Sequence, residues 1–478
     1  MLLRMMYDDK LAQAAYLIGC QRTREALVID PERDVDRYID AAAGEGLRIT
    51  AIAETHIHAD FLSGARELAE RTGARLYLSD EGGEGWRYTW LDKKSGGGSY
   101  VHVLLHDGDS FRIGGVRLTA IHTPGHTPEH LCFEVLDEGA GATAPLGIVT
   151  GDFVFVGDLG RPDLLETAAG QAGAKEPAAR ELRRSVLKFV KTPDFVQVWP
   201  GHGAGSACGK ALGAVPQSTV GYEKLTNSSI IGAADEEGFV RDILSGQPEP
   251  PLYFARMKRL NRDGPPVLGS LPRPARLDAQ GLAKLDTKST ALIDTRPWTK
   301  FRAGHIPGAL SVPLDRNFPA VAGSYVREGE RVALIVEEGR LEEAVRDLVR
   351  VGVDDVTGWA APEEVDAHGR AGGKLAEAPE IDAKALRSRL DSGEAPFILD
   401  VRRMDEYDEG HIAGALNATH VRLPERIEEL PRDRPIVVHC RSGVRSARAT
   451  ALLRRAGFDA TNLEGGYLAW AEQSRALR

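Results

Sequence analysis

The feature of this 478-residue chain that most restricts its fold is an internal duplication. One copy reads Asp-Thr-Arg from Asp294, followed by Gly-His-Ile-Pro-Gly-Ala-Leu from Gly304. The other reads Asp-Val-Arg from Asp400, followed by Gly-His-Ile-Ala-Gly-Ala-Leu from Gly410. Both pairs of matching positions are 106 residues apart, so a domain of roughly 100 residues is duplicated rather than a short repeat unit.

The chain is too long for one hydrophobic core, and its composition indicates where the domains end. Prolines are frequent from about 246 to 276, and we expect this stretch to be too proline-rich for continuous regular structure. A glycine-containing stretch, 360–380, separates the two repeats. These boundaries predict three domains, at residues 1–270, 275–370 and 378–478.

Each repeat is expected to alternate strands with helices. Short apolar runs of the buried-strand type occur twice in each copy, at 291–295 and 331–336 and again at 397–401 and 435–439. A helix is expected from Ser446 to Ala456. This alternation predicts an α/β fold with an open parallel sheet, whose functional residues lie at the carboxyl ends of the strands.

Only the second repeat has a cysteine at such a strand end. Cys440 is followed by a tight turn, Arg-Ser-Gly-Val-Arg, and then by the expected helix. Backbone N–H groups of the turn, the helix N-terminus, Arg441 and Arg445 are expected to point toward the sulfur and stabilise a thiolate or persulfide anion. The alternative, a buried structural cysteine, would not need two arginines in its loop.

The second repeat resembles the rhodanese family, whose motif Cys-Arg-x-Gly-x-Arg-Ser is matched from Cys440 to Ser446. Asp400, Arg402, Glu406 and the segment at His411 match the other family signature, and we interpret them as mainly structural.

The first repeat shares this resemblance through residues 294–310, but Glu-Glu-Gly-Arg-Leu-Glu-Glu begins at Glu337, after its second strand, and the copy has no cysteine. We therefore expect an inactive pseudo-rhodanese that packs the flanking domains together. Docking of substrate is the alternative.

The N-terminal domain carries a second set of chemical groups. A strand at 49–53 ends in His56, His58 and Asp60, and a helix is expected from 63 to 72. His126 follows a strand at 116–121, Asp152 follows one at 146–149, and His202 lies in Trp-Pro-Gly-His. A single histidine at such a position is more often structural, but four placements after strands in one domain predict a metal site.

These residues resemble the metallo-β-lactamase superfamily, whose fold is an αββα sandwich and whose motif His-x-His-x-Asp-His is nearly present from His56. The departure is Phe61, which stands where dinuclear members have a histidine for the second metal. We therefore expect one metal ion per chain.

Within the superfamily the chain resembles the persulfide dioxygenase branch, which binds one Fe(II). The resemblance implies that His56, His126 and Asp152 form a facial triad with three open positions, and Zn(II) is a possible substitute for iron. It also implies that further residues orient the ligands or bound water. These are His58, Asp60, His202, Arg161 and Asp163.

Cys208 follows His202 in a glycine-rich loop that is expected to lie near the metal, and Lys210 could lower the pKa of its thiol or attract an anionic substrate. The alternative is a small buried side chain. The chain resembles bacterial fusions of a persulfide dioxygenase with a sulfurtransferase, and these carry a cysteine in this loop. We therefore favour a thiol that accepts persulfide sulfur.

The order of domains resembles the bacterial three-domain persulfide dioxygenase–sulfurtransferase fusions. That resemblance implies oxidation of a low-molecular-weight thiol persulfide by O₂ to sulfite, followed by transfer of persulfide sulfur through Cys440 to give thiosulfate, a sulfide detoxification. The alternatives are a zinc hydrolase of the glyoxalase II type fused to a rhodanese, and a non-catalytic sulfur sensor or carrier. The thiol carrier is left open among glutathione, coenzyme A, bacillithiol and polysulfide, and homo-oligomers are possible.

Composition restricts the partners and the compartment. The formal net charge is −10 and there is no Lys/Arg-rich run, which argues against nucleic acid or an anionic membrane surface as a partner. The first ten residues do not resemble a signal peptide, and no apolar run is long enough for a membrane span. The four cysteines, Cys20, Cys132, Cys208 and Cys440, are widely spaced, which predicts a reducing cytoplasm.

Overall fold

The computed structural model describes residues 1–393 and 396–476. Its contacts divide the chain into two compact units. Unit 1 comprises Met1–Ser270 with Arg350–Gly352, and unit 2 comprises Leu271–Val349 and the chain from Val353 onward. Among the described residues, no helix is long and apolar enough to cross a lipid bilayer.

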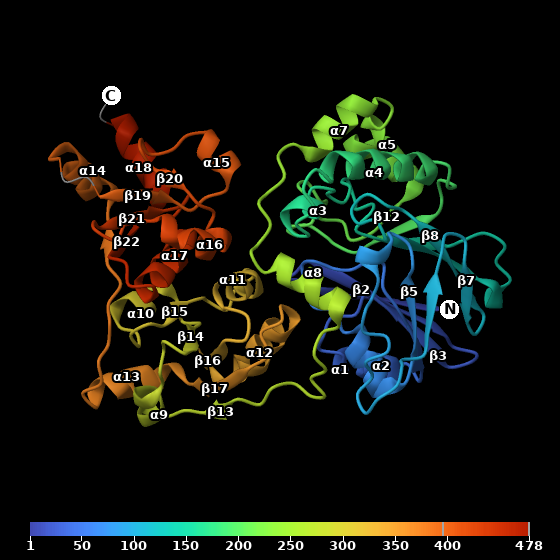
Figure 1. Cartoon of the computed structure of the whole chain (residues 1–478), viewed down its shortest axis with the longest axis horizontal. Helices are drawn as coiled ribbons and strands as arrows, with labels where there is room; N and C mark the ends of the chain where they lie inside the picture. Colours follow the sequence, from blue (N-terminus) through green and yellow to red (C-terminus); the bar gives the residue numbers. More distant parts are fainter. Residues whose placement is uncertain (394–395, 477–478) are drawn as a thin grey trace. The chain divides into compact units, whose positions relative to one another are not determined.

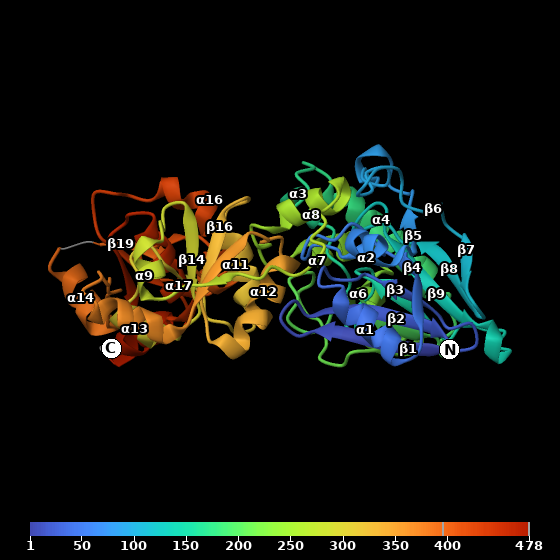
Figure 2. The ribbon, with the colours of Figure 1, turned by 90° about the horizontal axis from the view of Figure 1, so that it is seen from below.

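Unit 1 is built on two six-stranded sheets (Figure 1). The first sheet has its strands in chain order, antiparallel from β1 to β3 and parallel from β3 to β6. Its strands are β1 (Leu2–Asp8), β2 (Gln13–Cys20), β3 (Glu25–Ile29), β4 (Arg48–Ala53), β5 (Arg75–Ser79) and β6 (His102–Leu105). Figure 2 shows β3, β4 and β5 side by side in this sheet.

The second sheet is antiparallel except for one parallel pair, β10 with β11. Its strands also follow chain order across the sheet. They are β7 (Ser110–Ile113), β8 (Val116–His122), β9 (Leu131–Asp137), β10 (Gly147–Gly151), β11 (Gln197–Pro200) and β12 (Ser218–Thr219).

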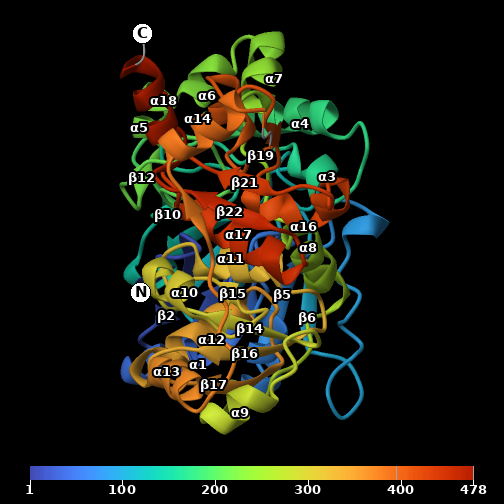
Figure 3. The same cartoon turned by 90° about the vertical axis from the view of Figure 1, so that its left-hand side faces the viewer.

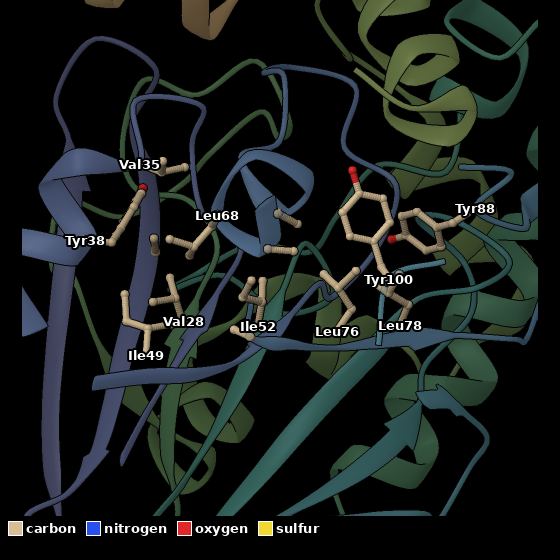
Figure 4. Close-up of a cluster of buried hydrophobic side chains, with 14 of the residues drawn as sticks. Val28, Val35, Tyr38, Ile49, Ile52, Leu68, Leu76, Leu78, Tyr88 and Tyr100 are labelled. Atoms are coloured by element: carbon tan, nitrogen blue, oxygen red, sulfur yellow. The ribbon is translucent and has the colours of Figure 1, made fainter. Parts of the chain in front are cut away.

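Helices cover the outer face of each sheet. α1 (Asp36–Gly44) and α2 (Ala65–Thr72) place Tyr38 and Leu68 against Val28, Ile49 and Ile52 of the first sheet (Figure 4). α4 (Lys175–Phe189), α5 (Val220–Thr226), α6 (Ser228–Gly232) and α7 (Glu236–Leu244) cover the second sheet. The short α3 (Leu164–Thr167) and the later α8 (Phe254–Asp263) complete the helices of this unit.

The inner faces of the two sheets pack on each other. Leu27 and Ala51 of the first sheet share a buried core with Leu118 of the second, and the rings of Tyr77 and Phe111 stack with centroids 3.8 Å apart. Burial of these apolar faces is the main stabilising contribution to such a sandwich. The predicted αββα architecture is confirmed.

Unit 2 contains two five-stranded parallel sheets of identical topology. The first sheet has the order β13-β17-β16-β14-β15 and the second has β18-β22-β21-β19-β20, so the duplication in sequence is a duplication of the fold. The first set is β13 (Ala275–Arg276), β14 (Thr290–Asp294), β15 (Leu310–Ser311), β16 (Arg331–Ile335) and β17 (Val356–Ala360). The second set is β18 (Glu380–Ile381), β19 (Phe397–Asp400), β20 (Leu416–Asn417), β21 (Ile436–His439) and β22 (Ala460–Leu463).

Helices flank both sheets of unit 2, and Figure 3 shows α17 beside β21 and β22. The first repeat has α9 (Ala279–Lys284), α10 (Trp298–Ala303), α11 (Phe318–Tyr325), α12 (Leu341–Arg350) and α13 (Pro362–Arg370). The second has α14 (Ala383–Asp391), α15 (Met404–Asp408), α16 (Leu423–Arg426), α17 (Val444–Arg455) and α18 (Gly466–Ala476). The rhodanese-like parallel α/β folds are confirmed.

The repeated Asp-x-Arg motif is a buried brace at the end of the second strand of each repeat. Arg402 donates from Nη2 to Asp400 (2.6 Å) and to the carbonyl oxygen of Gly410 (2.7 Å). Arg296 makes the same two bonds to Asp294 (2.7 Å) and to the carbonyl oxygen of Gly304 (2.9 Å). The motif occurs in both copies, including the one without a cysteine, and this agrees with our interpretation of it as structural.

One helix boundary and one loop prediction differ from the structure. The helix expected from Ser63 to Thr72 is present and ends at Thr72, but it begins at Ala65 with Gly64 as its N-cap residue, while the Ser63 hydroxyl accepts a hydrogen bond from the Ala65 N–H. The stretch 246–276 was expected to lack continuous regular structure, but α8 occupies Phe254–Asp263. No proline occurs between Pro251 and Pro265, so the helix fits between the two breakers.

The first repeat packs against the second within unit 2. Arg448 of α17, which is 3% exposed, pairs with Asp315 of the first repeat. Glu330 pairs with Arg455, and Glu380 accepts hydrogen bonds from Trp298 (2.7 Å) and Asn462 (2.9 Å). These contacts are consistent with a packing role for the first repeat.

Replacing Asp315 with alanine should destabilise unit 2 by about 1–3 kcal/mol, because the Arg448 guanidinium would stay buried without its carboxylate. Denaturant unfolding measures the effect. Asp366→Ala, on the exposed face of α13, is the control and should change stability by less than about 0.5 kcal/mol. Equal stability of both variants would show that the pair does not hold the repeats together.

Candidate metal centre and cysteine loop

Three loops of unit 1 bring two imidazoles and one carboxylate to a single point. His56 follows β4, His126 lies between β8 and β9, and Asp152 follows β10 directly. All three are at most 2% exposed. Nε2 of His126 lies 3.6 Å and Nε2 of His56 4.0 Å from Oδ2 of Asp152, and all ligand atoms of the group lie within 4.8 Å of one another.

The hydrogen bonds of this group leave its inward atoms available for a metal. The Thr55 hydroxyl donates to Asp30 (2.8 Å) and therefore accepts from Nδ1 of His56 (2.9 Å), which leaves Nε2 as a lone-pair donor. Nδ1 of His126 donates to the carbonyl oxygen of Arg161 (3.1 Å), with the same result. Nε2 of His56 and both carboxylate oxygens of Asp152 are buried without hydrogen-bond partners. Two nitrogen donors and a carboxylate suit Fe(II) or Zn(II).

The electrostatics of the site also favour a bound cation. Burial, with help from neighbouring His58, lowers the pKa of His56 well below its usual value, and burial lowers that of His126 likewise. Burial together with Asp60 raises the pKa of Asp152 to about 8. Neutral imidazoles are ready ligands, and a divalent cation would restore the ionised form of the carboxyl group.

Two supporting residues were not anticipated from the sequence. His130 accepts a hydrogen bond at Nε2 from the Asp152 N–H (3.1 Å) and stacks on His56 with ring centroids 5.1 Å apart. A Cβ at Gly160 would lie 1.7 Å from the Asp152 carbonyl oxygen, so only glycine fits there. His130 lies four residues after His126, but that spacing alone does not distinguish a metal ligand from a residue that positions the ligands.

His58 packs beside His56, with ring centroids 4.1 Å apart, and turns its Nε2 to two carboxylates. Its Nε2 lies 3.2 Å from Asp30 and 3.1 Å from Glu54, and its ring packs on Phe61 with centroids 4.3 Å apart. Burial alone would lower the pKa of His58, but Asp30 and Glu54 raise it well above its usual value. These three groups also have the spacing of metal ligands, and His58 lies close enough to both carboxylates to form buried ion pairs. Asp30 thereby holds both Thr55 and His58.

A second group with ligand spacing consists of Asp60, His202 and Cys208. Nε2 of His202 is hydrogen-bonded to Oδ2 of Asp60 (2.9 Å), and Nδ1 of His202 lies 3.7 Å from Oδ1 of Asp152. Cys208 is 1% exposed, and its Sγ lies within 4.8 Å of ligand atoms of Asp60 and His202. The structure thus places Cys208 beside His202, whose ring borders Asp152.

The expected effect of Lys210 on Cys208 is not observed. The pKa of Cys208 is raised well above its usual value by burial and by the carboxylates of Asp60 and Asp152. The Lys210 ammonium instead donates to the carbonyl oxygen of Ser245 (3.1 Å), beyond α7. Lys210 is two residues from Cys208 in the sequence, but its ammonium binds the loop after α7.

Arg161 and Asp163 connect the metal ligands to the Cys208 loop. The Arg161 guanidinium donates to both carboxylate oxygens of Asp163 (2.9 and 2.6 Å) and to the carbonyl oxygen of Ala207 (3.0 Å). The backbone carbonyl of the same arginine orients His126. Arg161 therefore supports the site through both its guanidinium, which binds Asp163 and Ala207, and its backbone carbonyl, which binds His126.

Helix α8 contributes to this site in a way that the sequence did not indicate. The Tyr253 hydroxyl, just before the helix, donates to the carbonyl oxygen of Asp60 (2.8 Å). Asn261 donates to the carbonyl oxygens of His58 and Phe61 (both 2.8 Å) and accepts from the Ser63 N–H (2.8 Å). Nearly two hundred residues separate these partners, so no local pattern could have indicated them.

The cysteine loop of unit 2 wraps around the sulfur of Cys440. The thiol, 1% exposed, accepts hydrogen bonds from the Gly443 N–H (3.2 Å) and the Ser446 hydroxyl (3.4 Å). Gly443 has φ +94° and lies at the N-terminus of α17, a conformation that favours glycine. The predicted turn and helix N-terminus thus surround the sulfur.

The two loop arginines differ. Arg445 interacts with the Cys440 side chain and forms a two-bond ion pair with Glu406 (2.6 and 2.7 Å). Burial alone would raise the pKa of Glu406, but Arg445 holds it below its usual value. Glu406, which we interpreted as mainly structural, therefore orients a residue of the cysteine loop. Arg441 is exposed.

The first repeat has no thiol at the corresponding position. Asp294 pairs with Ile335 and Asp400 with His439, so the next residues, Val336 and Cys440, correspond. The two repeats border a cavity of about 410 Å³, whose lining includes Trp298 and Asp315 from the first repeat and Ser442, Gly443 and Arg448 from the second.

Comparisons with known proteins agree with both parts of the fold. The family model of the metallo-beta-lactamase superfamily matches residues 8–202, and that of the rhodanese-like domain matches 278–357 and 382–473. A solved structure described as a metallo-beta-lactamase, from Staphylococcus aureus subsp. aureus COL, is 40% identical with a TM-score of 0.69. It covers 76% of this chain, which in turn covers 99% of it.

Two curated proteins match separate parts. A "Beta-lactamase hydrolase-like protein" of Xylella fastidiosa (strain 9a5c) is 30% identical over 49% of this chain, and the match spans 53% of that protein, about half its length. A "Sulfurtransferase" of Allochromatium vinosum is 41% identical over 19% of this chain and 87% of its own length.

The matches define a metal-binding fold joined to sulfurtransferase-like folds. The chain belongs to the metallo-beta-lactamase superfamily and carries two rhodanese-like domains after its metallo-beta-lactamase domain. Both folds are those of enzymes, which supports an enzymatic function.

Replacing His56 with alanine should weaken metal binding by more than about a hundredfold, because it removes one of three donors, whereas loss of an outer partner alone costs 10–100-fold. Metal content after dialysis, measured by plasma mass spectrometry, is the readout. His106→Ala, an exposed histidine, is the matched control. Full metal content in the His56 variant would show that the ion binds elsewhere.

Proposed function

We propose that the chain oxidises a low-molecular-weight thiol persulfide with O₂ at one iron centre and transfers persulfide sulfur through Cys440 to sulfite, giving thiosulfate. The observation that carries this proposal is the two-histidine, one-carboxylate group of His56, His126 and Asp152. The other histidines of the motif region are committed to carboxylates, His58 to Glu54 and His202 to Asp60, and Phe61 has no donor.

The first reaction is a four-electron oxidation of the terminal sulfur. One persulfide RSSH, one O₂ and one water give one thiol RSH and one sulfite with two protons, so the four electrons lost by sulfur reduce O₂ fully. Iron bound to the facial group would supply the redox chemistry and open positions for both reactants. Zinc in the same site would not supply the redox chemistry. Thr55 and Arg161 would keep the two imidazoles neutral and oriented by accepting their outer N–H bonds.

The second reaction is a sulfur transfer without net oxidation. A persulfide RSSH transfers its outer sulfur to the Cys440 thiolate and leaves as RSH, and the enzyme persulfide then passes that sulfur to sulfite to form thiosulfate. The Gly443 N–H, the Ser446 hydroxyl and Arg445 stabilise negative charge on the carried sulfur. The four cysteines are free thiols, which fits a reducing cytoplasm.

The substrates are small molecules: a thiol persulfide, O₂ and sulfite. We propose no nucleic-acid or membrane partner, and self-association is left to measurement. The thiol carrier could be any small thiol, since the proposal concerns its sulfur end.

The test compares iron-loaded and zinc-loaded protein. Iron-loaded protein should consume one O₂ per persulfide oxidised, and zinc-loaded protein should consume none. In Cys440→Ser, O₂ uptake should persist while the product shifts from thiosulfate to sulfite; Cys20→Ser, at the end of β2, is the control. Thiosulfate at the wild-type level in Cys440→Ser would remove Cys440 from the transfer step.

Cys208 is proposed to accept persulfide sulfur beside the iron, because its thiol lies in the buried group with Asp60 and His202 that borders Asp152. Cys208→Ser should retain one iron per chain but lower turnover or change the ratio of sulfite to thiosulfate. Wild-type protein treated with persulfide should gain one sulfur atom at Cys208 by mass spectrometry. Unchanged kinetics and no adduct would make the residue structural.

A zinc hydrolase acting on thioesters is the second candidate, favoured by the ligand spacing of Asp60, His202 and Cys208. Asp60, His202 and Cys208 would then hold a second zinc ion beside the one held by His56, His126 and Asp152, and the two ions would supply hydrolytic chemistry for a thioester. Two tightly bound zinc ions, loss of one of them in Cys208→Ser, and fast thioester hydrolysis would support this candidate over the dioxygenase.

A further inference from the structure

Lys258 is a buried cation that the chemistry above leaves unused. Its side chain on α8 is 8% exposed, and its ammonium lies 4.1 Å from the ring centroid of Trp86. Its hydrogen bond, to the carbonyl oxygen of Ile57, is long at 3.4 Å. In the part of the chain that the structure describes, residues 1–393 and 396–476, no carboxylate forms an ion pair with it. A buried charge with so little compensation is costly unless another partner is present.

The position of Lys258 is fixed by its helix. Tyr253 and Asn261 bind the carbonyl groups of Asp60, His58 and Phe61, so α8 is fastened to the loop that carries the first metal ligand. Lys258 lies between these two anchors on the buried face of the helix. The ammonium is therefore held at the site rather than mobile on the surface.

The charge of Lys258 acts on the metal site. Burial lowers its pKa to about 8, while Glu129, Asp152 and Cys208 favour its charged form. The carbonyl oxygen within reach of the ammonium belongs to Ile57, the residue after His56, so the ammonium lies at the loop that carries this ligand. Lys258 belongs to a segment beyond residues 8–202, the range that the superfamily model matches.

We propose that Lys258 binds the negative charge of a small sulfur anion, a persulfide or sulfite, beside the loop that carries His56. An ammonium has three N–H donors, and one long hydrogen bond leaves capacity for an anion. Charge-assisted hydrogen bonds to such an anion are stronger than neutral ones, and the water-poor surroundings strengthen them further. Lys258 would thereby select the anionic form of the substrate. The identity of that substrate rests on the proposed function, but the anion site does not.

The test uses sulfite and zinc-loaded protein, in which no oxidation occurs. Calorimetric titration should give an affinity about tenfold or more weaker for Lys258→Met than for wild type, since a charge-assisted bond is lost. Methionine keeps an apolar stem but removes the ammonium that lies over the Trp86 ring. Arg259→Met, the adjacent exposed cation of α8, should bind sulfite as wild type does.

Equal sulfite affinity in wild type and Lys258→Met, or no sulfite binding by wild type, would overturn the proposal. Lys258→Gln serves as a second variant if the methionine variant does not retain its metal. In iron-loaded protein, Lys258→Gln should raise the KM for persulfide more than it changes kcat. If wild type consumes no O₂ with persulfide yet sulfite binding still depends on Lys258, the dioxygenase proposal fails and the anion site stands.

Discussion

The surroundings of Asp152 determine what unit 1 can do. Its backbone N–H is bound by His130, Oδ2 faces His56 and His126, and Oδ1 faces His202. Both oxygens are buried without a hydrogen-bond donor, and an isolated buried carboxylate is strongly unfavourable. The fold maintains this arrangement through a second layer of contacts, from Thr55, Arg161 and α8. A bound cation resolves the electrostatic problem, which makes a metal centre the simplest account of the site.

Unit 2 shows how one fold carries both a supporting and a reactive copy. The two sheets share their strand order, and the same Asp-Arg-glycine brace occurs in each. Their difference is local: Val336 follows β16 of the first repeat where Cys440 follows β21 of the second. Loss of the thiol leaves the first repeat with contacts to α17, the helix that follows the cysteine loop, through Asp315 and Arg448.

Much of this could be predicted from the sequence because the signals were local. His56, His126 and Asp152 each follow a strand in the sequence, and this pattern indicated the metal group. The residues after Cys440 indicated a tight turn and a helix N-terminus around its sulfur. Contacts across long sequence separations could not be predicted in this way. The 246–276 stretch was judged by its prolines, so α8, and with it Asn261 and Lys258, went unanticipated. Glu406 matches a family motif, but the sequence does not show which residue it pairs with. The fold places it beside Arg445.

The most direct test of the account is the position of the metal in a crystal of anaerobically iron-loaded protein, located by anomalous scattering at the iron edge. The account predicts one strong peak per chain, within bonding distance of Nε2 of His56, Nε2 of His126 and a carboxylate oxygen of Asp152. A second peak of equal strength bound by Asp60, His202 and Cys208, or a single peak there instead, would contradict a mononuclear centre.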